Sequence, residues 1–481
     1  MLRLVRRSFK VFDETACFLV QCPIAMRISR LLVLCTIVAL MLVCMAFFNG
    51  FPIADTDTHT YIGDLLPGQR PPGGLYGYFV MLSSFHASLW FPVLVQGVLL
   101  SFVLVRYTGI VASAANMHRS EFYLPLLIAI VSFTGVSWAA SALAPGIFAA
   151  TLLLAVISFI VGKRPSAVGT LALFTLILVA VVMRPSHILT LTLFSVGLAT
   201  YGWRSARKEL LRQSMLLLLP CIASWAIIGS MNMAKGYGFA IVPGTPVYIT
   251  AKFAENGLLG EFLERNCNDK HLPLCDRRAN MPATVPTFLL LADSAMQAAG
   301  SKEPFLSQCR LIVRSMAVTP KYWGMFFQKT VISALGQLTQ VLPPPELPAY
   351  GKGAALYQKV SATFPDESRE YVTAMQHTDK ISLSFYRPLY ILVFLLSSAW
   401  LLLSWRKLPV RALGLIYTLV ILFLVANALS TAVTAALEDR SQYSIFWVLP
   451  ATNIIVLLCY YAARTPAFAH TYTQNAGDEK E

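Results

Sequence analysis

The sequence predicts an all-α polytopic membrane protein, and three observations lead there. The chain of 481 residues is 56% hydrophobic and 13% charged, and its mean hydropathy is +0.62. Soluble domains carry about 25% charged residues, so this composition excludes an ordinary soluble protein. Ten apolar runs of about 20 residues, each able to cross a bilayer, lie at 31–49, 88–106, 121–139, 143–162, 167–183, 188–203, 213–230, 385–405, 409–428 and 445–462.

These runs divide the chain into four parts. About seven helices form an N-terminal membrane domain over 1–230, with a first outer loop at 50–87. A hydrophilic segment follows over 231–384, then about three helices over 385–463 and a tail over 464–481. Helical spacing in "FLSQCRLIVRSMAVTP" and "KYWGMFFQKTVISALGQLTQ" predicts a mostly helical outer domain. The second stretch is also a candidate for a helix that lies on the membrane surface.

Basic residues set the expected orientation. The net charge is +14, but Lys and Arg stand in small groups between apolar runs, which argues against nucleic-acid binding. They concentrate in alternate loops, so both termini are expected in the cytoplasm and 231–384 outside. Three arginines remain in the short outer loops: Arg70, Arg184 and Arg440. A guanidinium at the membrane interface suits phosphate or carboxylate, which it binds with two charge-assisted hydrogen bonds.

Two cysteines of the outer segment predict a disulfide. Cys267 and Cys275 bracket the short loop "CNDKHLPLC", and an oxidising compartment would favour their pairing. Spacing alone leaves unpaired thiols as an alternative.

Polar residues gather in three short loops that the topology puts on the outer side. The first loop, "ADTDTHTYIGD", has the densest acids. Each group also has a purely structural interpretation. The D-x-D can be a helix cap or a solvated loop, and Arg440 can pair with a neighbouring acid. The histidines lack a second ligand at the spacing of a metal site. The residues are Asp55, Asp57, His59, Tyr61, Asp64 and Arg70 in the first loop, Arg184, Ser186 and His187 in "MRPSHIL", and Glu438, Asp439, Arg440 and Tyr443 in "ALEDRSQYSIFWVLP".

As a group, these residues suit transfer from a lipid-linked phosphate at the outer surface. A carboxylate could deprotonate an acceptor hydroxyl, and arginines could hold the phosphate and stabilise charge on the leaving group.

The order of motifs resembles the GT-C superfamily of bacterial membrane glycosyltransferases, which includes oligosaccharyl, protein mannosyl and lipid A aminoarabinose transferases. "DTHTY", from Asp57 to Tyr61, is similar to the D-x-x-x-Y signature that follows the first transmembrane helix in that superfamily. "RPPGGLYGYFVML", "MRPSHILTLTLF" and "EDRSQYSIFWVLP" resemble its later motifs. Two departures stand out. Arg440 and Tyr443 are not adjacent, and Gly146 stands where many relatives have an acid.

The resemblance implies a function and roles for the residues. It implies an inverting transfer of a sugar from a polyprenyl-phosphate donor to a hydroxyl of a lipid, glycan or protein, at the outer face of the bacterial inner membrane. Asp57 would be the base and Asp55 a second acid; if the enzyme is metal-dependent, both would hold Mg²⁺ or Mn²⁺. The expected phosphate ligands are Arg184, Arg440 and Arg70, and the expected supporting residues are Tyr61, His59, His187, Glu438 and Tyr443.

Three other functions stay open. An O-antigen polymerase or ligase type of enzyme would depend on Arg265, His271 and Arg278 in the long outer segment. A lipid or solute transporter would bury ionisable residues near the bilayer midplane, and the apolar runs hold few of them away from their ends. A subunit for envelope assembly could keep the fold without the activity.

Overall fold

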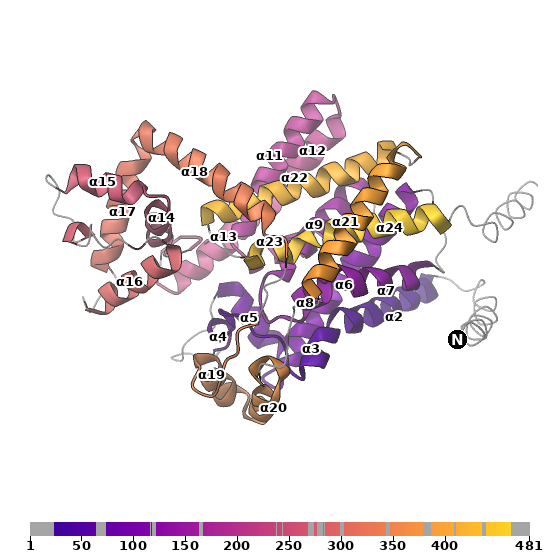
Figure 1. Ribbon diagram of the computed structural model, residues 1–481, viewed down its shortest axis with the longest axis horizontal. Coiled ribbons are helices and arrows are strands. Elements are labelled where there is room, and N and C mark those ends of the chain that lie inside the picture. The colour runs from indigo at the N-terminus through magenta and orange to yellow at the C-terminus, as the bar shows by residue number, and fades with distance from the viewer. Residues whose placement is uncertain are drawn as a thin grey trace, which may run out of the picture.

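The fold is entirely helical in the part of the chain that the structure describes. A computed structural model describes residues 24–63, 74–115, 117, 122–162, 167–236, 238–242, 244–267, 274–276, 282, 284–298, 303–342, 347–378, 386–407, 410–434 and 439–462. Over these residues the β-structure is limited to one isolated bridge, between Ile53 and Ala142. Figure 1 shows the helices gathered into a large bundle, with a smaller group of helices set apart from it.

The chain is a membrane-embedded protein by the length and composition of its helices. Five helices among the described residues are long and apolar enough to cross a bilayer: Trp90–Ala114, Lys208–Ala234, Tyr386–Ser404, Leu413–Thr434 and Gln442–Ala462. Shorter apolar helices accompany them at Ser29–Leu42, Gly74–Ser83, Tyr123–Thr134, Ile147–Val161 and Ala167–Met183. Each of these ten helices overlaps or adjoins one of the predicted runs or the first outer loop.

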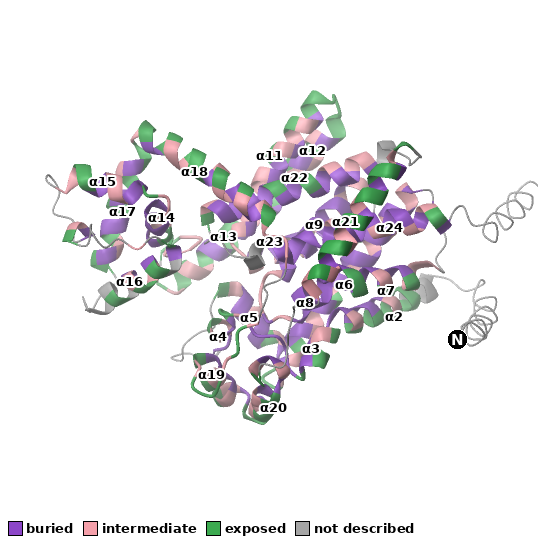
Figure 2. Cartoon of the chain, viewed as in Figure 1, coloured by how far each residue is buried: buried purple, intermediate pink, exposed green. Residues whose placement is uncertain are grey.

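The N-terminal part supplies most of the bundle. Its helices are α2 (Ile24–Leu42), α3 (Cys44–Asn49), α4 (Thr58–Tyr61), α5 (Gly74–Ser83), α6 (Trp90–Ala114), α7 (Tyr123–Thr134), α8 (Val136–Ser141), α9 (Ile147–Val161), α10 (Ala167–Met183), α11 (Ser186–Arg204), α12 (Lys208–Leu216) and α13 (Leu218–Ala234). The apolar helix α9 is central, because all its side chains except Phe159 and Val161 are buried (Figure 2). It packs against α6 and α10.

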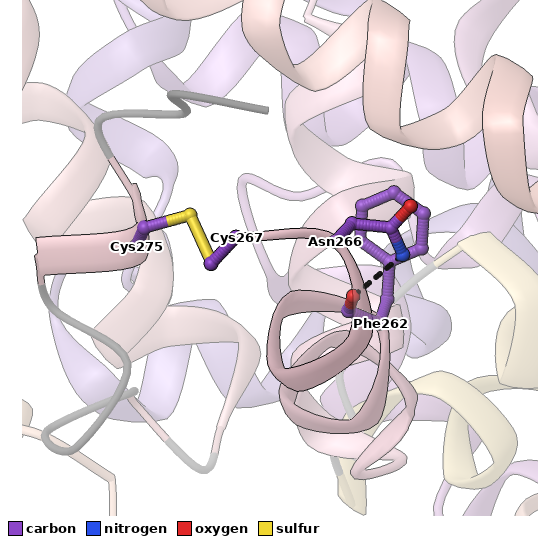
Figure 3. Close-up of a disulfide and its surroundings, with 4 residues drawn as sticks. All are labelled: Phe262, Asn266, Cys267 and Cys275. Atoms are coloured by element: carbon purple, nitrogen blue, oxygen red, sulfur yellow. Dashed lines mark hydrogen bonds between the residues drawn. A yellow bond between two sulfur atoms is a disulfide. The ribbon is translucent and has the colours of Figure 1, made fainter. Parts of the chain in front are cut away.

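Four helices form an outer module with its own core. They are α14 (Thr245–Glu255), α15 (Leu258–Asn266), α16 (Val285–Ala298) and α17 (Glu303–Ala317), and their apolar side chains make a core separate from that of the bundle. The disulfide between Cys267 and Cys275 closes the loop that follows α15, with 5.7 Å between the two Cα atoms (Figure 3). The side-chain amide of Asn266 donates to the Phe262 carbonyl at 2.8 Å in the last turn of α15.

A long helix returns the chain to the bundle. α18 (Pro320–Thr339) leaves the outer module and packs along α22 (Val410–Thr434). The remaining membrane helices are α21 (Tyr386–Ser404), α23 (Asp439–Phe446) and α24 (Val448–Ala462).

Residues 347–378, here called the docked segment, do not belong to the outer module. They contain α19 (Ala355–Thr363), α20 (Ser368–Thr373) and two short 3₁₀ turns, Pro365–Glu367 and Met375–Thr378. Leu356, Val360, Phe364 and Tyr371 are buried in the core of the bundle. Figure 1 shows α19 and α20 below α4, α5 and α3, the helices next to the first outer loop. The outer segment therefore splits into two units, and one of them covers that loop.

Two buried side chains attach the docked segment to the bundle. Both carboxylate oxygens of Glu367 accept from the Leu89 backbone N–H at 3.1 Å, just before α6, and the Ser88 hydroxyl also donates to Glu367. This puts a carboxylate at a helix N-terminus, where the backbone dipole favours negative charge. Gln376 is 1% exposed and bonds both backbone groups of Ala54, with its side-chain oxygen accepting at 2.9 Å and its amide donating at 2.8 Å.

His377 should make this attachment sensitive to acid. Its Nδ1 accepts from the Tyr350 backbone N–H at 3.2 Å, its ring stacks on Tyr371, and burial lowers the pKa of the imidazole from its usual 6.5 to about 4. The neutral ring is needed for this bond, so docking should be most stable above pH 6.5. As the pH falls from 6.5 toward 4, His377 takes up a proton in the undocked segment but stays neutral in the docked one. The free energy that favours docking therefore falls by at most about 1.4 kcal/mol per pH unit.

Hydrogen exchange of 347–378 across this range would measure the effect. The wild-type segment should lose protection as the pH falls, whereas His377→Asn, which keeps an acceptor but does not titrate there, should show a flatter profile. Equal profiles for the two proteins would remove His377 as the cause.

Candidate functional site

The first outer loop is held in place by its own backbone. Ile53 donates to the Ser141 carbonyl at 2.9 Å and accepts from the Leu143 N–H at 2.8 Å, which aligns the loop with the end of α8. The Thr58 hydroxyl donates to the Leu143 carbonyl at 3.0 Å and accepts from the Asp55 N–H at 2.7 Å. With Gln376 on its other side, the segment 53–58 is fixed from two directions.

The two aspartates of this loop have different surroundings. Asp55 is half-buried, and its Oδ1 accepts from the Thr56 N–H at 2.7 Å. Asp57 is exposed and begins α4, where its backbone carbonyl accepts from Thr60. His59 is turned to the same loop, with its Nδ1 2.9 Å from the Thr56 carbonyl. Asp55 is thus the more enclosed carboxylate, and Asp57 lies closer to solvent.

Two tyrosines from separate helices lie within electrostatic range of the Asp55 carboxylate. It interacts electrostatically with the phenols of Tyr76 on α5 and Tyr443 on α23. The Tyr61 ring packs edge-on against Tyr76 with centroids 4.8 Å apart. Tyr443 also interacts electrostatically with Tyr386 and Tyr390, at the start of α21. We call these five residues the tyrosine cluster. They come from helices that are far apart in the sequence and meet at the loop that carries Asp55.

Three buried hydrogen-bond donors, two of them on tyrosines of this cluster, have no acceptor among the described residues. They are the hydroxyls of Tyr386 and Tyr390 and the indole N–H of Trp138. Tyr390 is 2% exposed, and the Trp138 and Tyr386 rings lie 6.0 Å apart. A buried donor without a partner costs about 1–3 kcal/mol, and native structures keep few of them. Such a group of donors fits a ligand that presents oxygen acceptors.

Gly135 makes room for the Tyr386 hydroxyl. The residue has a φ of +75°, and a Cβ at this position would overlap that hydroxyl. Gly50 has a similar φ of +79°, but no atom lies within 4 Å of its added Cβ. Gly50→Ala should therefore cost only the left-handed backbone strain, about 1–2 kcal/mol. Gly135→Ala should cost about 1–3 kcal/mol more, because it also overpacks the cluster.

Thermal unfolding of the two glycine variants in detergent would measure this difference. Similar melting temperatures would show that Tyr386 moves away at little cost, and that its position is not fixed.

The second outer group lies where α10 meets α11. His187 is fully buried and its Nδ1 donates to the Ala180 carbonyl at 2.8 Å, while Arg184 lies close enough to act on it electrostatically. The Ser430 hydroxyl of α22 donates to the Ser186 carbonyl at 2.8 Å. His187 therefore stabilises the turn that presents Arg184, next to the outer half of α22.

The third group belongs to α23. This helix is hydrogen-bonded to α22 and carries Tyr443 of the tyrosine cluster. The side-chain amide of Asn427 on α22 donates to Gln442 at 3.0 Å. Gly146 faces the same helix, because a Cβ there would lie 3.4 Å from the Ser444 Cβ. Arg440 lies in the first turn of α23, but its side chain, like Arg70, Asp64 and Glu438, is outside the described residues.

The last predicted groups are the metal ligands and the outer arginines. Among the described residues, no group of three His, Cys, Asp or Glu side chains could hold a metal ion. Arg265 lies far along the chain on α15, in an exposed ion pair with Glu261 at 3.0 Å. His271 and Arg278 lie outside the described residues.

Sequence reasoning missed five residues of this site: Gln376, Tyr76, Trp138 and the pair Tyr386 and Tyr390. The two tyrosines stand four apart at the start of an apolar run, in "YRPLY", and this spacing could have pointed to a polar helix end. Gln376 carries no such local signal, because its partners on the first loop are more than 320 residues away.

Comparisons of the chain with models of protein families, with curated proteins and with solved structures gave no match.

Proposed function

We propose that the protein is a membrane glycosyltransferase of the GT-C type, which transfers a sugar from a polyprenyl-phosphate donor to an acceptor hydroxyl at the outer face of the membrane. One observation carries most of the proposal. The half-buried Asp55 carboxylate lies on a loop fixed from two sides, next to phenols from α5 and α23. A carboxylate held in this way suits a general base.

In this mechanism Asp55 takes the proton of the acceptor hydroxyl, and the hydroxyl oxygen attacks the anomeric carbon from the side opposite the phosphate. The bond between that carbon and the phosphate oxygen breaks, and its electron pair leaves with the polyprenyl phosphate. One displacement inverts the anomeric centre. Asp57, which lies closer to solvent, is the second acid and orients the acceptor.

The unpartnered donors favour a phosphate group as their ligand, on the side of the anomeric carbon where the leaving group departs. Phenol and indole groups donate to anionic oxygens, and in a low-dielectric site they stabilise the charge that develops on a leaving group. Tyr386, Tyr390 and Trp138 are proposed to act with Arg184 and Arg440 in this way. The five come from α8, the α10–α11 turn, α21 and α23.

A donor-consumption assay would test the function. The purified chain in proteoliposomes would receive polyprenyl-phosphate hexoses and pentoses labelled in the sugar, with extracted envelope lipids and glycans as acceptors. The expected result is release of polyprenyl phosphate, with the label moved to the acceptor. Transfer of whole glycan chains would indicate the ligase type of enzyme instead. Movement of intact donor across the membrane without transfer would indicate a transporter.

A further inference from the structure

Helix α18 buries two polar side chains and leaves a row of large apolar ones exposed. Thr330 and Gln337 are 7% and 0% exposed and face the rest of the protein. Trp323, Phe327 and Leu335 are 56%, 68% and 59% exposed. With Val331, these three recur every four residues, so they form one ridge along the helix, here called the α18 ridge. Figure 2 shows exposed residues along this helix.

The preceding helix has the opposite arrangement. In α17 the residues Phe305, Cys309, Ile312 and Met316 are buried, and Arg310 and Arg314 are exposed. This is the pattern of a helix that faces water. The exposed surface of α17 is therefore charged where that of α18 carries this apolar row, which indicates that the two faces meet different surroundings.

Helix α18 lies beside a helix that is long and apolar enough to cross the bilayer. α18 packs along α22 through small residues, with Ala334 buried against Ala428 and Ala432. Close contact through small side chains is typical of helix pairs in membranes. Farther along α22, Ile421 and Val425 remain exposed and apolar, as expected for side chains that face lipid.

We infer that the α18 ridge is embedded in the outer leaflet of the bilayer, with phospholipid acyl chains as its partner. The length agrees, because the twelve steps along the helix from Trp323 to Leu335 rise about 18 Å, close to the depth of one hydrocarbon leaflet, about 15 Å. Trp323 lies nearest the outer module, where a tryptophan suits the interface. Lys329 is exposed elsewhere on the helix, and its long side chain can reach the head groups.

Nitroxide scanning of the full chain would test this inference without any assay of activity. Single cysteines would replace Trp323, Phe327, Val331 and Leu335 in a background that keeps the disulfide and lacks the other thiols. The protein would be placed in nanodiscs of phosphatidylethanolamine and phosphatidylglycerol, and collision with oxygen and with a water-soluble nickel chelate would be measured. Ile421→Cys is the lipid reference, Arg310→Cys and Arg314→Cys are the water references, and Lys329→Cys is the contrast within α18.

The four ridge positions should match Ile421, with high collision rates for oxygen and low rates for nickel, while Lys329 should be more accessible to nickel than its neighbours on the ridge. High nickel accessibility at the ridge would overturn the inference. Low accessibility to both reagents, with spin coupling that disappears on dilution by unlabelled protein, would also overturn it, because a second copy would then cover the ridge. Monodisperse elution of each labelled variant would show that it folds.

Discussion

Asp55→Asn should lower transfer by about 10²–10⁴-fold, the contribution expected of a positioned general base. The amide keeps the shape of the side chain and can still accept from the Thr56 N–H, so the loop should keep its conformation. It cannot accept the proton of the acceptor hydroxyl. The drop should appear in the rate of the chemical step, with the apparent affinity for the donor little changed.

Asp57→Asn is the matched control, because it makes the same chemical change two residues away on an exposed side chain. Its effect should be much smaller than that of Asp55→Asn. Full activity of Asp55→Asn together with loss in Asp57→Asn would reverse the two roles and return Asp57 to the position of base. Full activity in both variants would exclude a carboxylate base on this loop.

Gln376→Leu should destabilise the first outer loop by about 3 kcal/mol or more. The leucine fills a similar volume but leaves the buried N–H and C=O of Ala54 without partners, together with the Pro348 carbonyl that now accepts at 3.0 Å. Each such group costs about 1–3 kcal/mol. Faster hydrogen exchange over 50–63 and a fall in transfer should appear in the same variant.

Gln358→Leu provides the control for this change, because Gln358 lies on an exposed side of α19 in the same docked segment. It should leave exchange over 50–63 as in the wild type. If Gln376→Leu also left that exchange unchanged, the docked segment would not be what fixes the loop.

The membrane character of the fold could be predicted from the sequence, but the breaks in its helices could not. Length and hydropathy are local properties, so runs such as 88–106 and 385–405 have clear counterparts in α6 and α21. The run at 121–139 is divided instead into α7 and α8, because Gly135 takes a left-handed conformation where Tyr386 approaches. The run at 143–162 starts as a helix only at Ile147, after the segment that pairs with Ile53.

The site was predictable to a similar extent. The polar loops at 54–64 and 438–443 could be recognised from their composition, and the structure brings Asp55 and Tyr443 within electrostatic range of each other. What composition could not show is which acid is enclosed. That depends on Gln376, Ser141 and Leu143, which are distant in the sequence and have no distinctive pattern of their own.

The attachment of the docked segment also sets the order in which the protein can mature during synthesis. The loop with Asp55 emerges early, yet both hydrogen bonds to the backbone of Ala54 come from Gln376, 322 residues later. Every helix up to α18 must be synthesised before this partner exists. A ribosome-bound chain stopped before residue 347 would therefore carry its membrane helices with an unfinished loop, and completion of the site would mark the last stage of biogenesis.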